Sequence, residues 1–205
     1  MASQDAPQLY LITPPEIELS RFPATLDEVL GVHSVACIRL ALSSTDPDLI
    51  ARATDAVREV AHARDVALVI EAHVAMAERL GLDGVHLTDG ARSVRSARAA
   101  LGPDAIVGAF CGASRHDGMT AGEAGADYVS FGPVRDTGLG AGGIAESDLF
   151  AWWSEMIEVP VVAEGALTGT EVSVLWDKAD FLGFGSEIWD EADPLAALTA
   201  LLPPG

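Results

Sequence analysis

Charged side chains that could do chemistry recur where short apolar runs of this sequence end. Arg39 and Glu71 lie near the ends of the second and third runs, and His73 and Asp89 follow the third and fourth. A guanidinium binds anions, a carboxylate binds a cation or moves a proton, and a histidine exchanges protons near neutral pH. We therefore consider Arg39, Glu71 and His73 as catalytic residues, and Glu71 and Asp89 as metal ligands.

Small residues follow the seventh and eighth apolar runs, at Gly165-Ala166 and Gly185-Ser186. Small side chains leave backbone N–H groups open to a ligand, and in many parallel barrels the loops at these two places bind phosphate. The alternative is that glycine only lets a helix and a strand pack closely. We expect these four residues to bind a phosphate group.

The segment 132–143, after the sixth run, is too rich in glycine for a packed element. A loop of this composition could close over a ligand and bring Arg135 or Thr137 onto it, which would also exclude water. A flexible surface loop without such a role is the alternative. We place Thr137 among the catalytic candidates and Arg135 among the phosphate-binding candidates.

Eight short runs rich in Val, Ile, Leu and Phe alternate with amphipathic stretches, which predicts alternating strands and helices. The runs are 9–13, 35–40, 67–71, 84–88, 106–111, 128–132, 159–163 and 181–185. The helical stretches are 26–32, 48–64, 74–80, 93–101, 119–124, 147–156, 171–178 and 194–202. Strands that are apolar on both faces and separated by helices form parallel sheets. Eight such units predict an α/β fold, a (β/α)8 TIM barrel that forms a single domain over residues 1–205, and they bring the residues above to one face of it.

The sequence has 205 residues, with 12 Lys and Arg against 31 Asp and Glu, so its formal charge is −19. Such a field repels phosphate backbones and anionic lipids, so we expect no nucleic-acid or membrane partner. The first eight residues lack the features of a secretory signal, and we expect a cytoplasmic protein. Cys37 and Cys111 lie in separate runs and are expected to be free, buried thiols. The sequence leaves open whether the protein forms homo-oligomers.

An ordered set of fragments resembles the thiamine phosphate synthase and TenI superfamily over nearly the whole chain. The fragments are Leu9-Tyr10-Leu11-Ile12-Thr13, Gly84-Val85-His86-Leu87, Gly125-Ala126-Asp127-Tyr128-Val129, Phe131-Gly132-Pro133 with Thr137, and Val159-Pro160-Val161-Val162-Ala163. The resemblance implies that a hydroxymethylpyrimidine diphosphate ionises, that a thiazole phosphate traps the cation, and that pyrophosphate leaves. It also implies Mg²⁺, which helps the diphosphate to leave. The expected ligand is thus a small phosphorylated molecule.

The chain departs from the family pattern at four places around this site. Of the family's Gln-x-Arg-x-Lys pattern, this chain has only the arginine, Arg39. Ala72 occupies the position where the family has a metal-binding Asp. The segment 88–91 replaces Gly-Gln-x-Asp, and Leu139-Gly140 replaces a Thr-Lys pair. Glu71 and Asp89 are the nearby carboxylates, but Glu71 is offset by one residue, and neighbours on a strand point to opposite faces.

Three interpretations therefore remain open. The first is a thiamine phosphate synthase-like enzyme with Arg39 as its anion anchor. The second is a non-catalytic, phosphate-ligand-binding or regulatory homologue, because metal and diphosphate ligands are missing. The third is a TenI-like enzyme with a changed substrate, although Pro133 stands where a TenI tautomerase resembles Phe-Gly-His, and proline cannot transfer a proton. His86 lies inside a strand-like run and is expected to be a core residue.

Overall fold

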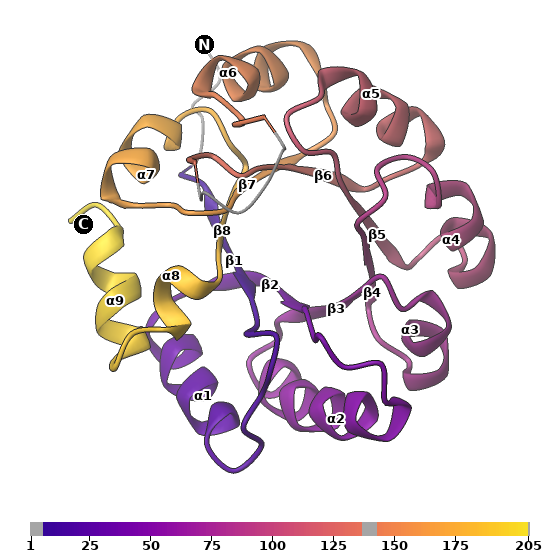
Figure 1. The fold of residues 1–205 in the computed structure, drawn as a ribbon, viewed down its shortest axis with the longest axis vertical. Helices are drawn as coiled ribbons and strands as arrows, with labels where there is room; N and C mark the ends of the chain where they lie inside the picture. The colour runs from indigo at the N-terminus through magenta and orange to yellow at the C-terminus, as the bar shows by residue number, and fades with distance from the viewer. Residues whose placement is uncertain (1–5, 137–142, 205) are drawn as a thin grey trace.

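The structure is a closed parallel barrel of eight strands surrounded by helices, as the alternating pattern predicts (Figure 1). This computed structural model describes residues 6–136 and 143–204. Neighbouring strands pair in sequence order, and β8 closes the ring on β1. The strands are β1 (Gln8–Ile12), β2 (Val35–Leu40), β3 (Ala67–Glu71), β4 (Gly84–Leu87), β5 (Ile106–Phe110), β6 (Tyr128–Phe131), β7 (Val161–Glu164) and β8 (Phe181–Phe184).

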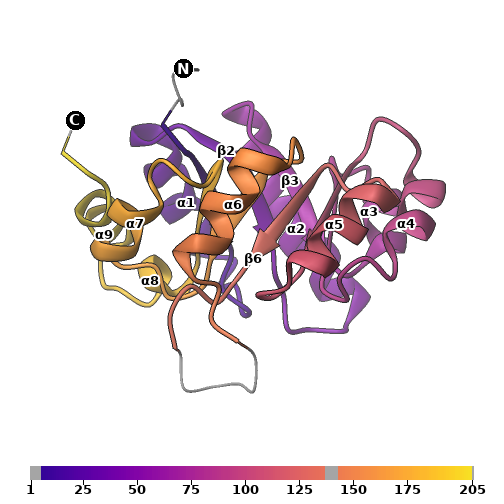
Figure 2. The same cartoon turned by 90° about the horizontal axis from the view of Figure 1, so that it is seen from above.

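The helices cover the outside of the barrel, which the side view shows (Figure 2). They are α1 (Phe22–Val32), α2 (Pro47–Ala63), α3 (Val74–Leu80), α4 (Val94–Leu101), α5 (Arg115–Ala124), α6 (Ser147–Met156), α7 (Gly169–Leu175), α8 (Ser186–Trp189) and α9 (Pro194–Leu201). Among the described residues, no helix is both long and apolar enough to cross a membrane.

Helix boundaries follow capping signals in the sequence. Asp46 caps α2, because its side chain accepts a hydrogen bond from Asp48 N and Pro47 fills the first turn. Gly81 ends α3 at φ 61°, a left-handed conformation that glycine adopts without the steric cost of a Cβ. These boundaries determine where each helix begins and ends, and therefore where the next strand can start.

The barrel has two apolar compartments. The larger one lies between the strands and the helices, and it includes Leu11, Ile38, Phe131 and Trp153. A smaller cluster fills the interior of the barrel with the side chains of Tyr10, Cys37, Val69, Tyr128 and Val162. Cys37 and Cys111 are both free and buried, as expected.

Three aspartates make the same kind of hydrogen bond at the face of the barrel where the strands begin. Asp83 accepts a hydrogen bond from Leu68 N at 2.7 Å, and Asp127 accepts one from Val107 N at the same distance. Asp180 does the same for Val161 N at 2.8 Å. Each carboxylate satisfies a backbone donor of the preceding strand. These contacts hold the strand register at one face and leave the opposite face, which we call the mouth, for ligands.

Candidate active site

Arg39 of β2 is the centre of a buried polar cluster inside the barrel. Its Nη1 and Nη2 donate to the Glu164 carboxylate of β7 at 2.9 and 3.1 Å, a bidentate pair. Its Nε lies 3.3 Å from Oε2 of Glu71, an ion pair without hydrogen-bond geometry. Nη1 also lies 2.7 Å from Nε2 of His86 on β4. Four strands thus converge on one guanidinium at the mouth end of the barrel.

The two carboxylates keep Arg39 charged. Burial alone would lower the pKa of the Arg39 guanidinium, but Glu164, Tyr10 and Glu71 together more than offset this, and the pKa lies above its usual value. Burial raises the pKa of Glu71, and Arg39 only partly counters that effect. Because one guanidinium faces two carboxylates, the cluster carries a net negative charge once both are ionised. Such a cluster attracts a cation.

A directed chain of hydrogen bonds continues from Arg39 into the interior. A guanidinium has no acceptor, so Nε2 of His86 must accept from it and Nδ1 must carry the proton. Nδ1 then donates to the Tyr128 hydroxyl at 2.9 Å, which lies 2.7 Å from the Tyr10 hydroxyl. Burial and Arg39 lower the pKa of His86 well below its usual value. His86 is therefore a neutral, fixed link between the mouth and the interior.

The structure brings some of the catalytic candidates together. Arg39 and Glu71 are paired, and His73, at the N-cap position of α3, lies close enough to oppose in part the rise in the pKa of Glu71 that burial causes. Glu71 points inward because it lies on the same face of β3 as Ala67 and Val69, which belong to the interior cluster, whereas Ala72 has left the strand at φ 61°. The expectation that the one-residue offset would turn Glu71 away from the site is therefore wrong, because position 72 is not part of the strand. Thr137 lies outside the described residues, as does the Leu139-Gly140 replacement.

The two metal candidates have separate partners. Glu71 faces Arg39, whereas Asp89 is exposed and accepts a hydrogen bond from Ser93 Oγ at 2.6 Å. In residues 6–136 and 143–204, no group of three or more His, Cys, Asp or Glu side chains is arranged to hold a metal. The residues expected to bind Mg²⁺ thus do not fit it as a protein-built site, and we derive no chemical step through it.

The phosphate-binding candidates after β7 and β8 lie next to each other. Gly165 and Ala166 form a turn with φ values of 87° and 64°, and Gly185 precedes Ser186 at the start of α8. The Glu187 carboxylate joins the two segments: it accepts from Gly185 N at 2.7 Å and from Leu167 N at 3.1 Å. A side chain of the protein therefore already occupies two of the amides in this region.

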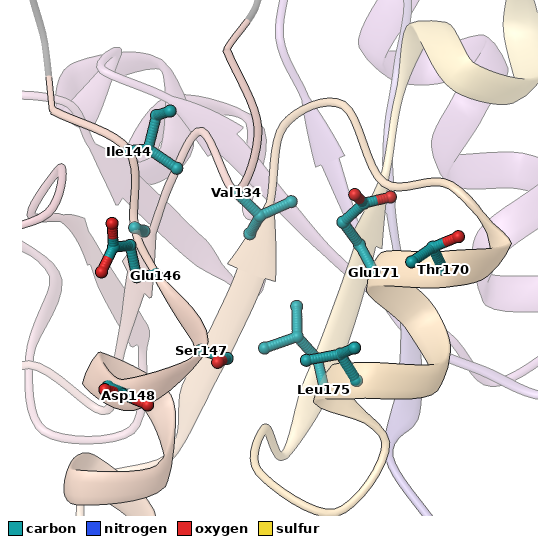
Figure 3. Close-up of a pocket in the computed structure, with 10 residues that line it drawn as sticks. Val134, Ile144, Glu146, Ser147, Asp148, Thr170, Glu171 and Leu175 are labelled. Atoms are coloured by element: carbon teal, nitrogen blue, oxygen red, sulfur yellow. The ribbon is translucent and has the colours of Figure 1, made fainter.

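Arg135 is exposed on the loop after β6, and it acts electrostatically on Glu171 of α7. A surface pocket of about 440 Å³ lies beside this loop, between α6 and α7 (Figure 3). Ser147 and Asp148 line it from α6, and Thr170 and Leu175 from α7. None of its lining residues belongs to the Arg39 cluster. The converging titratable groups, rather than this pocket, define the candidate active site.

Sequence reasoning missed part of this cluster. His86 was expected to be a core residue, and it is buried, but it also binds Arg39. Tyr10 and Tyr128 were noted only as parts of family fragments. Strand alternation places all three inside the barrel, yet their mutual contacts depend on register between strands far apart in the sequence.

Comparison with known proteins agrees with the fold and with these fragments. The family model described as "Thiamine monophosphate synthase" matches residues 9–186. The thiamine-phosphate synthase of Rhodospirillum centenum is 41% identical over 194 residues, covering 93% of this chain and 94% of that protein. The thiamine-phosphate synthase of Erythrobacter litoralis is 39% identical over 207 residues, covering 98% and 96%.

A solved structure also resembles the barrel. The thiamine phosphate pyrophosphorylase from Pyrococcus furiosus superposes with a TM-score of 0.79 at 21% identity, covering 95% of this chain and 93% of that one. At this identity the likeness supports the fold alone. The family model matches from Leu9 in β1 to Ser186 after β8, and the sequence relatives cover nearly the whole chain, so this chain belongs to the thiamine monophosphate synthase family.

Proposed function

We propose that the protein couples hydroxymethylpyrimidine diphosphate with a thiazole phosphate and releases pyrophosphate. The observation that supports this most directly is the cluster of Glu71, Arg39 and Glu164 inside the mouth. The names of the two sequence relatives described above, both thiamine-phosphate synthases, support the same reaction.

The chemistry requires a site that tolerates positive charge. The bond between the pyrimidine methylene carbon and the diphosphate oxygen breaks, and its electron pair leaves with pyrophosphate. The methylene carbon becomes cationic until the thiazole nitrogen attacks it with its lone pair and forms the new C–N bond. Fixed negative charge near the developing cation lowers the barrier, because the protein dipoles and charges are already in place.

Glu71 and Glu164 would supply this negative charge. Arg39 holds Glu164 by two hydrogen bonds and faces Glu71 through Nε, so both carboxylates are positioned before a ligand arrives. Glu71 is the more accessible of the two, with 32% of its side chain exposed against 10% for Glu164. We therefore assign Glu71 the contact with the pyrimidine and Glu164 the role of positioning Arg39. His73 would adjust the charge of Glu71 from the start of α3.

The test is pyrophosphate release by purified protein given both precursors in magnesium-containing buffer, with the coupled product followed in parallel. We expect Glu71→Gln to lower kcat by about 10²-fold, the usual effect of removing one preorganised electrostatic group. Glu155→Gln, which neutralises an exposed carboxylate on α6, is the matched control and should leave kcat unchanged.

Two outcomes would contradict the proposal. Absence of turnover together with measurable binding of the thiazole phosphate would support the non-catalytic homologue instead. Absence of both turnover and binding at millimolar concentration would support an enzyme with a changed substrate. Equal kcat for wild type and Glu71→Gln would remove Glu71 from the mechanism.

A further inference from the structure

The Glu187 side chain connects its own segment, after β8, with Leu167, which lies 20 residues earlier in the sequence. Oε2 accepts from Gly185 N at 2.7 Å, and Oε1 accepts from Leu167 N at 3.1 Å. One amide follows β8 and the other follows the Gly165-Ala166 turn after β7. Both oxygens of one carboxylate are therefore held by backbone donors from the two loops where we expected a phosphate.

A carboxylate and a phosphate compete for such donors because both are anions that accept several hydrogen bonds at once. The Glu187 carboxylate is tethered to the chain, so its effective concentration at these amides is high. A ligand phosphate must displace it to use the same two donors. It must also enter a mouth that already holds the negative charges of Glu71 and Glu164, with Arg39 paired to both.

Gly185 lies in uncrowded surroundings, and Leu167 is anchored in the core. Around Gly185, a Cβ would find no heavy atom closer than 3.6 Å, and one of the two nearest is Oε2 of Glu187 itself. The side chain of Leu167 is buried in the core, so its amide belongs to a well-anchored turn. The Leu167 donor is thus anchored by its buried side chain, whereas the Glu187 carboxylate lies at the end of a side chain with rotatable bonds.

We propose that Glu187 is a specificity-determining residue that fills an anion-binding position with the chain's own carboxylate. It weakens the binding of phosphorylated ligands at the β7 and β8 loops. The difference in affinity between a thiazole phosphate and the corresponding thiazole alcohol therefore becomes smaller. This inference rests on the proposed function for the choice of ligands, but the competition for amides does not depend on turnover.

The first test is calorimetric titration of the thiazole phosphate, the thiazole alcohol and inorganic phosphate into wild type and Glu187→Ala. We expect Glu187→Ala to bind the thiazole phosphate and inorganic phosphate about tenfold more tightly, with alcohol affinity changed by less than twofold, since only the anions gain two free amide donors. Glu191→Ala is the matched control, because it removes an exposed carboxylate from the turn after the same helix. It should leave all three affinities within twofold of wild type.

Three results would overturn the proposal. They are an unchanged or weaker affinity of Glu187→Ala for phosphate, an equal gain for the alcohol, and an equal gain in Glu191→Ala, which would show a general charge effect. If pyrophosphate release fails in wild type while the phosphate gain appears in Glu187→Ala, the proposed function fails and this inference stands.

A second measurement covers the possibility that Glu187 serves only to join the two loops. Thermal unfolding of wild type, Glu187→Gln and Glu187→Ala is followed with and without 50 mM inorganic phosphate at constant ionic strength (about 0.2 M). We expect phosphate to raise the Tm of Glu187→Ala more than that of wild type, because it replaces the lost anion. If both variants lose Tm and phosphate restores none of it, Glu187 is a structural link and the proposal is wrong.

Discussion

Nη1 of Arg39 donates to Nε2 of His86 across 2.7 Å inside the barrel, and this contact fixes the state of the imidazole. Because arginine is a donor only, Nε2 is the unprotonated nitrogen and Nδ1 carries the proton that goes to Tyr128. Protonating His86 would place two cations against each other in a fully buried position. The pairing therefore links the charge of the mouth to the stability of the barrel.

The first prediction concerns the dependence of stability on pH. Folding lowers the pKa of His86, mainly by burial. At a pH below the unfolded pKa of about 6.5, the unfolded chain therefore binds a proton at His86 that the folded chain does not bind. Stability from this residue is complete above that pH and is lost as pH falls, by up to about 1.4 kcal/mol per pH unit. His86→Gln should remove this slope.

The measurement is urea unfolding of wild type and His86→Gln between pH 5 and pH 8 (about the range in which histidine titrates). His116→Gln, at an exposed position in α5, is the control and should keep the slope of the wild type. If the difference in unfolding free energy between wild type and His86→Gln is constant over this range, His86 does not have the neutral state assigned to it.

The second prediction concerns the buried pair of Arg39 and Glu164. Arg39→Met leaves the Glu164 carboxylate buried without its two hydrogen bonds, and we expect a loss of about 3–5 kcal/mol in unfolding free energy. The double variant Arg39→Met with Glu164→Leu removes both charges and should regain most of that loss. Additive effects of the two substitutions in a double-mutant cycle would show that the two side chains do not interact.

The third prediction concerns backbone strain at the mouth. Ala72 and Ala166 have φ values of 61° and 64°, where a Cβ is unfavourable by roughly 1–2 kcal/mol. Replacing either with glycine relieves this strain but adds freedom to the unfolded chain, so we expect a net gain of about 0.5 kcal/mol. Ala99→Gly, on the exposed face of α4, should instead lose about 1 kcal/mol. Denaturant unfolding of the three variants tests the difference in sign, and a loss at both mouth positions would contradict it.

The sequence was sufficient for the barrel because the signals that define it are local. β2 and β3 have the bounds that their apolar runs predict, and so do α3 and α6. The predicted start of α5 at residue 119 was wrong, since the helix begins at Arg115, and Gly118 inside it obscured the pattern. A Cβ on Gly118 would lie 2.7 Å from Trp153, so this glycine is a packing requirement and not a helix breaker. α8 has four residues, too few to give a periodic signal.

The site was less predictable because its contacts join distant strands. Arg39 and Glu164 are 125 residues apart, and only the closed register brings them together. Arg39 was expected to be an anion anchor, but a single sequence does not show that two carboxylates already face it. The role of Glu187 was missed for the same reason: its partners, Gly185 and Leu167, follow different strands. The residue types of the site could be predicted from the sequence, but which of these residues contact one another could not.

The last prediction concerns the space that the interior chain requires. Gly108 of β5 faces Tyr128, and a Cβ there would lie 2.1 Å from Cζ of that ring, closer than atoms can approach. Gly108→Ala must therefore displace the tyrosine, which moves its hydroxyl away from both His86 and Tyr10. We expect a loss of about 1–3 kcal/mol from overpacking, and more where the hydrogen bonds break.

Two further variants decide whether the tyrosine is the cause. Gly169→Ala, at the start of α7, has open space around the added methyl group and should be neutral or slightly stabilising. Tyr128→Leu shortens the side chain, so adding Gly108→Ala to it should cost less than adding Gly108→Ala to wild type. The readout is the unfolding free energy of the four variants in urea. If Gly108→Ala lowers the unfolding free energy equally in wild type and in Tyr128→Leu, Gly108 is required for a reason other than room for Tyr128. The hydrogen bonds of His86, Tyr128 and Tyr10 would then tolerate a larger residue at position 108 of β5.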